Sequence, residues 1–289
     1  MSLASPAPVS TIMEQFQEDG FYILRGFLTP DEVAGARREM ERRVDQFAAV
    51  LLAERKVDSL FQDEPFETRL YRLYAQHMED APLSLSPILN HLAGLFPIYF
   101  NPRLLDLVEQ ILGPEIRLYP NYFVRPKFPD FAGTDVLWHQ DAAYTVFGQD
   151  DPSRIELARM INCWTPLVPA TQHNGCMQFV PGSHKLGLVR HVKDEQAQYL
   201  VIAPEVLAEH EPRAIDIEMD PGDVVFFSNL MFHQGQPNRS GAIRWSMDWR
   251  YQDARQSTMR PQSGHLARSR EHPDRVVRDG RHWASLEWN

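Results

Sequence analysis

The pattern of the chain changes at Pro114, and this change constrains the fold more than any other feature. Before it the residues favour helices, and after it come short alternating or apolar segments separated by turn dipeptides. The expected strands are 116–124, 136–139, 158–165, 176–180, 214–218, 223–227 and 243–251. Several short strands with Asn-Gly and Pro-Gly turns between them are typical of a jelly roll or double-sheet barrel.

The half before Pro114 contains well-marked helices. The segment 29–54 begins with threonine in the N-cap position, proline in the first turn and glutamate three residues after the threonine, which together form a capping box. A second helix is expected over 101–112. Because the helices precede the strands, we expect them to form a layer outside the barrel.

No repeat or linker divides the chain. We expect residues 1–12 to form a flexible N-terminal arm and residues 13–289 to form a single domain. With 289 residues, of which 43% are hydrophobic, the chain can bury a substantial core. The predicted fold class is mainly β, with the N-terminal helices packed outside a jelly-roll barrel.

Charge and cysteine content narrow the possible partners. The formal net charge of −10 disfavours nucleic acid and anionic membrane surfaces as partners. No apolar run reaches the length of a bilayer span, and the N-terminal residues lack the features of a signal peptide. Two cysteines without a CxxC pair fit a cytoplasmic protein. Acidic surfaces are common among enzymes, so the charge itself indicates no particular substrate.

Two histidines and an aspartate in the strand-rich half have the spacing of a metal site. His139 and Asp141 follow an expected strand, in which side chains at i and i+2 point to one face. His233 follows the apolar run 224–227 and supplies a third ligand. Two histidines and one carboxylate leave three positions of an iron ion open for a bidentate co-substrate and O₂.

Two other segments have a similar spacing. His272 and Asp274 lie in a tail rich in proline and arginine, without a strand signal. His77 and Glu79 lie in an expected helix, where residues i and i+2 do not share a face. The local structure therefore favours the pair formed by residues 139 and 141.

Arg244 follows His233 by eleven residues, at the start of the last expected strand. A buried arginine needs an anionic partner, and a guanidinium group matches a carboxylate in a bidentate manner. The far carboxylate of 2-oxoglutarate fits this role, while the keto-acid end of that molecule chelates iron. Ser246 shares the face of Arg244 and can donate a further hydrogen bond.

The segments around these residues resemble the phytanoyl-CoA dioxygenase family. That family has a W-x-x-L segment, an N-G turn and a P-G-[ST]-H-K turn between the metal ligands, followed by N-x-S and arginine. In this chain they are 164–167, 174–175, 181–185, 238–240 and Arg244. The resemblance extends over residues 14–251 and is specific for the family rather than for a substrate.

The resemblance implies a double-stranded β-helix of the cupin-like, jelly-roll type. It implies iron(II) as cofactor, 2-oxoglutarate and O₂ as co-substrates, and succinate and CO₂ as products. The expected iron ligands are His139, Asp141 and His233. The expected 2-oxoglutarate site consists of Arg244, Ser246, Trp164 and Asn162.

Two positions bear on the chemistry within this family. Some members have serine two residues after the distal histidine, where it helps to hold 2-oxoglutarate. This chain has Gly235 there, and Ser246 or a water molecule is the expected substitute. In related halogenases a small residue replaces the carboxylate ligand. The presence of Asp141 therefore favours hydroxylation, desaturation or ring chemistry over halogenation.

Aromatic residues near the ligands are candidates for the substrate pocket, although core packing explains them about equally well. They are Tyr144, Phe147, Tyr122 and Trp249. The arginine-rich segment 255–281 either meets an anionic substrate or forms a solvated surface, and the second interpretation is favoured. Residues 55–100 are expected to cover the pocket.

The expected activity is oxidation, by default hydroxylation, of an unactivated C–H bond of a small metabolite in a biosynthetic or catabolic pathway. The alternatives are an acyl-CoA 2-hydroxylase of the phytanoyl-CoA type, a cupin-type dioxygenase independent of 2-oxoglutarate, and a non-catalytic metal-binding barrel. Cupin sites usually contain more histidines and would leave Arg244 without a partner. The intact ligand set argues against a non-catalytic barrel. Monomer and homodimer both remain open.

Overall fold

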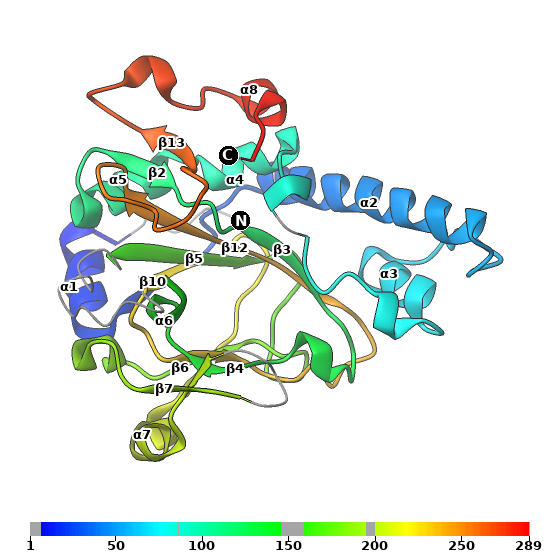
Figure 1. Cartoon of the computed structure of the whole chain (residues 1–289), viewed down its shortest axis with the longest axis horizontal. Helices are drawn as coiled ribbons and strands as arrows, with labels where there is room; N and C mark the ends of the chain where they lie inside the picture. Colours follow the sequence, from blue (N-terminus) through cyan, green and yellow to red (C-terminus); the bar gives the residue numbers. More distant parts are fainter. Residues whose placement is uncertain (1–6, 86, 146–158, 195–199, 289) are drawn as a thin grey trace.

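The computed structural model describes residues 7–85, 87–145, 159–194 and 200–288. Its centre consists of two antiparallel sheets, with most of the helices on one side (Figure 1). The larger sheet has the order β1 (Phe21–Leu24), β10 (Val224–Ser228), β5 (Met160–Pro166), β12 (Arg244–Asp253), β2 (Ile116–Leu118) and β13 (His265–Arg268), with β3 (Phe123–Lys127) also paired to β12.

The smaller sheet carries both histidines of the expected metal site, His139 in β4 and His233 in β11. Its order is β4 (Val136–His139), β11 (His233–Gly235), β6 (Met177–Phe179) and β9 (Ile215–Ile217). A separate ribbon consists of β7 (His191–Lys193) and β8 (Leu200–Ile202). The expectation of a mainly β, jelly-roll fold with helices outside is confirmed, although no hydrogen-bonded strand pair closes the two sheets into a barrel among the described residues.

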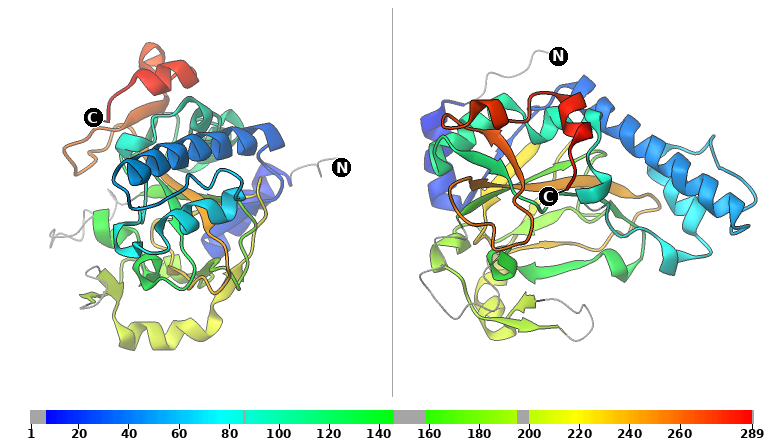
Figure 2. Two further views of the ribbon diagram at one scale, coloured as in Figure 1. Left: turned by 90° about the vertical axis from the view of Figure 1, so that its right-hand side faces the viewer. Right: turned by 45° about the horizontal axis from the view of Figure 1, so that its top comes forward.

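The helices are α1 (Val9–Asp19), α2 (Pro30–Ala53), α3 (Phe66–Tyr74), α4 (Phe96–Tyr99), α5 (Pro102–Leu112), α6 (Ala142–Thr145), α7 (Pro204–His210) and α8 (Gly280–Ser285). The predicted capping box of α2 forms, since the Thr29 hydroxyl accepts a hydrogen bond from the Glu32 amide and the Glu32 carboxylate accepts one from the Thr29 amide. Figure 2 shows α2 and α7 on opposite sides of the sheets. No helix in the described ranges has the length and apolar character needed to cross a bilayer.

Helix α1 begins at Val9, inside the segment expected to be an arm. Ile12 and Phe16 lie one helical turn apart, and both are buried. The ring of Phe16 stacks on that of Phe226 in β10, with 5.4 Å between the ring centroids. Packing against the sheet therefore stabilises the helix close to its first turn.

Strand β12 separates the helical layer from the space between the sheets. Its odd-numbered residues, Trp245, Met247, Trp249 and Tyr251, belong to the main hydrophobic core. Trp249 packs edge-on against Tyr99 of α4. The even-numbered residues are polar and point to the other face. The helices thus cover one face of β12, and the other face is left for a site.

Two predicted details differ from the structure. The expected strand 116–124 is two strands, because the chain turns at Pro120 between β2 and β3. Segment 255–281 was expected to form a solvated surface, yet it contains β13, and its residues Ala267 and Val277 belong to the main core. Just after it, Trp283 of α8 is fully buried against His91 and Tyr99.

Candidate functional site

The three predicted metal ligands meet in a cavity of about 510 Å³ between the two sheets. One possible ligand atom from each of His139, Asp141 and His233 lies within 4.8 Å of the others, and all three residues are buried. His139 Nε2 lies 3.6 Å from Asp141 Oδ1, and His233 Nε2 lies 4.0 Å from Asp141 Oδ2. The histidines are cross-strand partners in β4 and β11, so strand pairing places them side by side.

Each histidine presents the same nitrogen to this point. The Nδ1–H of His139 donates to the carbonyl of Leu137 at 2.8 Å, and that of His233 donates to the carbonyl of Met231 at 3.0 Å. A hydrogen bond from Nδ1 leaves the Nε2 lone pair available for a metal. Burial, and then the charge of His139, lower the pKa of His233 to about 3, so its imidazole is neutral at ordinary pH. The donor set fits a divalent iron ion.

Gln140, between His139 and Asp141, ties the H-x-D segment to neighbouring loops by hydrogen bonds. Strand β4 ends at His139, so strand alternation alone does not place Asp141. The fully buried Gln140 amide donates to the carbonyls of Gly187 and Leu230 at 2.8 and 2.7 Å. Its oxygen also accepts a hydrogen bond from a backbone amide, and its own backbone amide donates to His191 Nε2 at 3.2 Å. His191 therefore supports the H-x-D segment.

Arg250 is the charged partner of Asp141. Its guanidinium donates to Asp141 Oδ2 at 2.8 Å and to Asp248 Oδ2 at 3.3 Å. Burial alone would raise the pKa of Asp141, but Arg250 and the two histidines hold it well below its usual range. The sequence reasoning did not single out Arg250. The available signal was the alternation in β12, where Arg244, Ser246, Asp248 and Arg250 share one face.

Arg244 lies at the other end of the same face, buried and directed at the cavity. It donates to the Ser246 hydroxyl at 3.3 Å, and its guanidinium lies 5.2 Å from the ring centre of Trp164. Its Nε has no hydrogen-bond partner, and no ion pair joins it to a carboxylate in the described part of the chain. Burial lowers the pKa of Arg244 to about 10, so the group remains charged. A buried, charged arginine of this kind calls for an anion.

Lys127 is a second cation at this end that the sequence reasoning did not identify. It is 2% exposed and is the cross-strand partner of Arg244. Its ammonium donates to the carbonyl of Thr134 at 2.8 Å and lies 3.3 Å from Asp135. Burial, and then the charge of Arg244, lower its pKa to about 7.

The structure brings together most of the other predicted site residues. Asn162, Trp164 and Tyr144 line the cavity, as does Trp249, although the latter packs mainly into the helical layer. Tyr122 does not belong to the lining, because the turn at Pro120 shifts which residues of the following strand face the cavity. Its hydroxyl group shares a hydrogen bond of 2.6 Å with Nε2 of His91. Phe147 lies outside the described residues.

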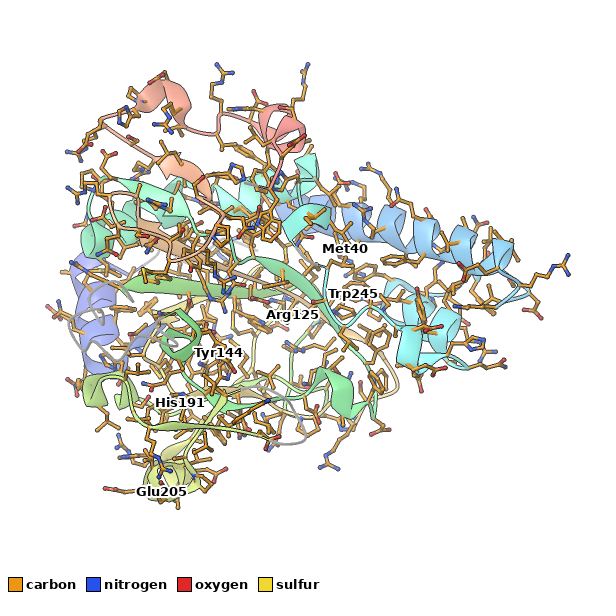
Figure 3. All side chains as sticks on the ribbon, in the orientation of Figure 1. Met40, Arg125, Tyr144, His191, Glu205 and Trp245 are labelled. Atoms are coloured by element: carbon orange, nitrogen blue, oxygen red, sulfur yellow. The ribbon has the colours of Figure 1, made fainter. Side chains whose placement is uncertain are left out.

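The lining of the cavity also includes residues from segments far apart in the sequence. Leu83 and Ser84, from the region expected to cover the pocket, form part of its lining, as does Arg260 from the arginine-rich tail. Arg125 on β3 and Tyr144 in α6 lie near the middle of the molecule, between the two layers (Figure 3). Two other tail arginines, Arg268 and Arg270, point elsewhere and pair with Glu109.

Comparison with known proteins agrees with this geometry. The bovine phytanoyl-CoA dioxygenase domain-containing protein 1 is 28% identical over 206 residues, which are 62% of this chain and 67% of that protein. The ectoine dioxygenase of Bordetella parapertussis is 28% identical, over 60% of this chain and 48% of that protein. The 1-deoxypentalenic acid 11-beta-hydroxylase of Streptomyces arenae is 30% identical, over 54% of this chain and 56% of that protein. The match thus spans about half to two thirds of these relatives.

Solved structures share the fold. The apo form of the non-heme monooxygenase ThoJ superposes with a TM-score of 0.60 at 23% identity, covering 89% of this chain and 84% of that protein. EctD from S. alaskensis, with 2-oxoglutarate and 5-hydroxyectoine, has a TM-score of 0.58 at 22% identity, covering 88% and 79%. The family model of phytanoyl-CoA dioxygenase (PhyH) matches residues 16–246. The chain therefore belongs to the phytanoyl-CoA dioxygenase family, which confirms the resemblance and the enzyme class expected from the sequence.

Proposed function

We propose that this enzyme uses iron(II), 2-oxoglutarate and O₂ to hydroxylate an unactivated C–H bond of a small organic molecule, with release of succinate and CO₂. The observation that carries the proposal is the presence of two complementary sites in one cavity. His139, Asp141 and His233 converge at one point, and the buried, charged Arg244 faces the same space. A cupin-type reaction without 2-oxoglutarate would leave that guanidinium without an anion.

Different residues of the cavity would bind the metal and the co-substrate. The two imidazoles and the carboxylate of Asp141 would hold the metal, which supplies with 2-oxoglutarate and O₂ the oxidising power for C–H cleavage. Arg244 and Ser246 would bind the far carboxylate of the co-substrate, and Trp164 would bound that subsite. Because the two histidines, Arg244, Ser246 and Trp164 lie on strands of two facing sheets, their positions need little change when a ligand binds.

The remaining wall indicates the kind of substrate. A volume of about 510 Å³ fits a small or medium-sized organic molecule once the co-substrate is in place. The lining includes polar groups from Asn121, Tyr144 and the ion pair between Arg125 and Asp248, whose closest atoms are 2.5 Å apart. We propose a substrate with polar groups along its length. The acyl-CoA alternative gains little from the tail, since Arg268 is already engaged with acidic side chains.

The test is an anaerobic titration followed by turnover. Iron(II) and 2-oxoglutarate together should produce the weak visible charge-transfer band of a chelated keto acid, and O₂ should then lead to succinate. Asp141→Ala should abolish both signals, because the metal loses its anionic ligand. Asp274→Ala is the matched control, since it lies in the other H-x-D segment. Full activity of Asp141→Ala would refute the ligand assignment.

A further inference from the structure

One arginine of the C-terminal segment lies at the cavity. Arg260 belongs to the cavity lining, whereas Arg268 and Arg270 of the same segment pair with Glu109. The segment 255–281 was expected either to meet an anionic substrate or to form a solvated surface. The position of Arg260 supports the first interpretation for this residue.

The loop that carries Arg260 connects β12 to β13 and is tied to β2, which lies beside β13 (Figure 1). Arg117 of β2 donates to two backbone carbonyls of the loop, at 2.8 and 2.9 Å. The hydroxyl group of Tyr119 donates to a third carbonyl at 2.7 Å. Met259 has a φ of +56°, a left-handed conformation that costs energy for a residue with a side chain. The loop therefore keeps a strained backbone next to Arg260.

The guanidinium group of Arg260 has a neutral partner. Its Nε donates to the Tyr119 hydroxyl at 3.1 Å, and its carbon lies 5.6 Å from the centre of the Tyr119 ring. No ion pair joins it to a carboxylate in the described part of the chain. The backbone amide of Tyr119 donates to the carbonyl of Arg250 at 2.9 Å. Because Arg250 and Arg244 lie roughly 20 Å apart along β12, Arg260 is at the end of the cavity away from Arg244.

The charges of the cavity leave room for an anion besides the co-substrate. The lining contains Arg125, Lys127, Arg244, Arg250 and Arg260, but only three aspartates. Iron(II) and the dianion of 2-oxoglutarate would cancel each other. Since the pKa of Lys127 is lowered to about 7, part of this lysine is neutral at pH 7. Even with that lysine neutral, the cations outnumber the aspartates, so the cavity keeps a positive charge.

The pairing of these groups places the excess charge at Arg260. The aspartates of the lining already accept hydrogen bonds or ion pairs from cations of β3 and β12. Arg244 is assigned to the co-substrate, and Arg260 is the other lining cation outside these pairs. The whole chain has a formal net charge of −10. A small anion can therefore enter a positive cavity, whereas a molecule with several negative charges would be repelled by the surface.

We propose that Arg260 determines specificity by binding a carboxylate group of the substrate, so that the substrate is a small organic acid. This inference rests on the proposed function and names the substrate class for it. The Nη groups of Arg260 would donate to the carboxylate, while Nε keeps its hydrogen bond to Tyr119. The substrate carboxylate and the far carboxylate of 2-oxoglutarate would then lie at opposite ends of the polar face of β12.

Binding of acids and of their amides tests the charge of the substrate. The anaerobic iron(II) protein, saturated with 2-oxoglutarate, is titrated calorimetrically with monocarboxylic acids of about six to twelve carbon atoms and with the primary amide of each acid. The charge-transfer band is recorded in parallel, because its persistence shows that the probe does not displace the co-substrate. Acids should bind about fivefold or more tightly than their amides. Added salt should reduce this preference, since Arg260 is exposed.

Three variants test whether Arg260 recognises that charge. In Arg260→Met, the dissociation constants of the acids should rise about fivefold or more, and those of the amides should change less than about twofold. Arg260→Lys keeps the charge without the planar fork and should retain part of the preference. Arg278→Met is the matched control, because it removes an exposed arginine of the same segment that is outside the cavity lining. It should bind the acids as the wild type does.

The outcomes separate this inference from the proposed function. If the band forms but acids and amides bind equally, or no acid binds, the substrate class is wrong and the proposed function stands. If the preference for acids survives in Arg260→Met, or is lost equally in Arg278→Met, the role of Arg260 is refuted. If the wild type binds iron(II) but forms no band with 2-oxoglutarate, the proposed function fails. The inference then fails with it, because Arg244 would be free to bind the acids itself.

Discussion

Replacement of Arg250 by methionine is expected to weaken metal binding although Arg250 is not itself a ligand. The guanidinium donates to Asp141 Oδ2 at 2.8 Å, and to Asp248 and the carbonyl of Asn121 at 3.3 and 3.1 Å. These bonds hold the carboxylate ligand in one orientation within a buried site. Methionine retains much of the side-chain length and removes the charge and all three hydrogen bonds.

The size of the effect follows from the lost contact. A hydrogen bond between charged groups contributes about 1.5–3 kcal/mol. Loss of a group that orients a metal ligand typically lowers metal affinity about 10- to 100-fold, which corresponds to about 1.4–2.7 kcal/mol. Repulsion between the guanidinium and a bound dication acts in the opposite direction. Because Asp141 is buried, we expect the loss of orientation to outweigh the relief of that repulsion.

The assay is an anaerobic titration with iron(II), or with cobalt(II) followed by its visible absorption, which reads metal binding without turnover. Arg125→Met is the matched control, since Arg125 pairs with Asp248 at 2.5 Å and is not paired with Asp141 among the described ion pairs. The control should bind metal as the wild type does. Wild-type or tighter affinity in Arg250→Met, in a folded protein, would refute the orienting role.

Three further changes test other parts of the structure. Gln140→Leu leaves buried backbone groups unpaired and should lower the free energy of unfolding by about 2–4 kcal/mol in urea titrations, and a loss below about 0.5 kcal/mol would contradict its supporting role. Without ligand, the free energy of unfolding of the wild type relative to that of Lys127→Met should rise between about pH 7 and pH 10.5, by up to about 1.4 kcal/mol per pH unit. The reason is that lysine in the unfolded chain keeps its proton up to its ordinary pKa of 10.5, while the buried Lys127 loses its proton near pH 7. A flat difference would show that Lys127 is not perturbed. Gly175→Ala should clearly lower the melting temperature, because Gly175 has a φ of +82° and an added Cβ would lie 2.4 Å from the carbonyl oxygen of Gln236. An unchanged melting temperature would mean that the turn adapts to the added Cβ.

Local rules account for the parts of the fold that the sequence predicted well. The capping signal before α2 depends on side chains three residues apart, so it can be read without a tertiary structure. The same holds for the alternation in β12, which predicts one apolar and one polar face. The very short strands β7, β8 and β11 have no comparable local signal. They form because partner strands offer hydrogen bonds, and this information is not local.

The candidate site shows the same division. His139 and Asp141 could be selected from the strand signal that precedes them, and His233 from the apolar run before it. Tyr122 could not be assigned to a face, because the turn at Pro120 restarts the alternation. The sequence shows Gln140 only as the residue between His139 and Asp141. Its role emerged from hydrogen bonds to segments about 50 and 90 residues away.

The sequence by itself determined the candidate metal ligands, the polar face of the last long strand and the family. Each of these depends on residue type and short spacing. Only the tertiary structure decided that Arg250 pairs with Asp141, 109 positions away, and that Lys127 lies opposite Arg244. These pairings depend on strand register and on how the two sheets pack face to face. Such long-range contacts are properties of the folded chain, because strand pairing brings together residues that no local pattern relates.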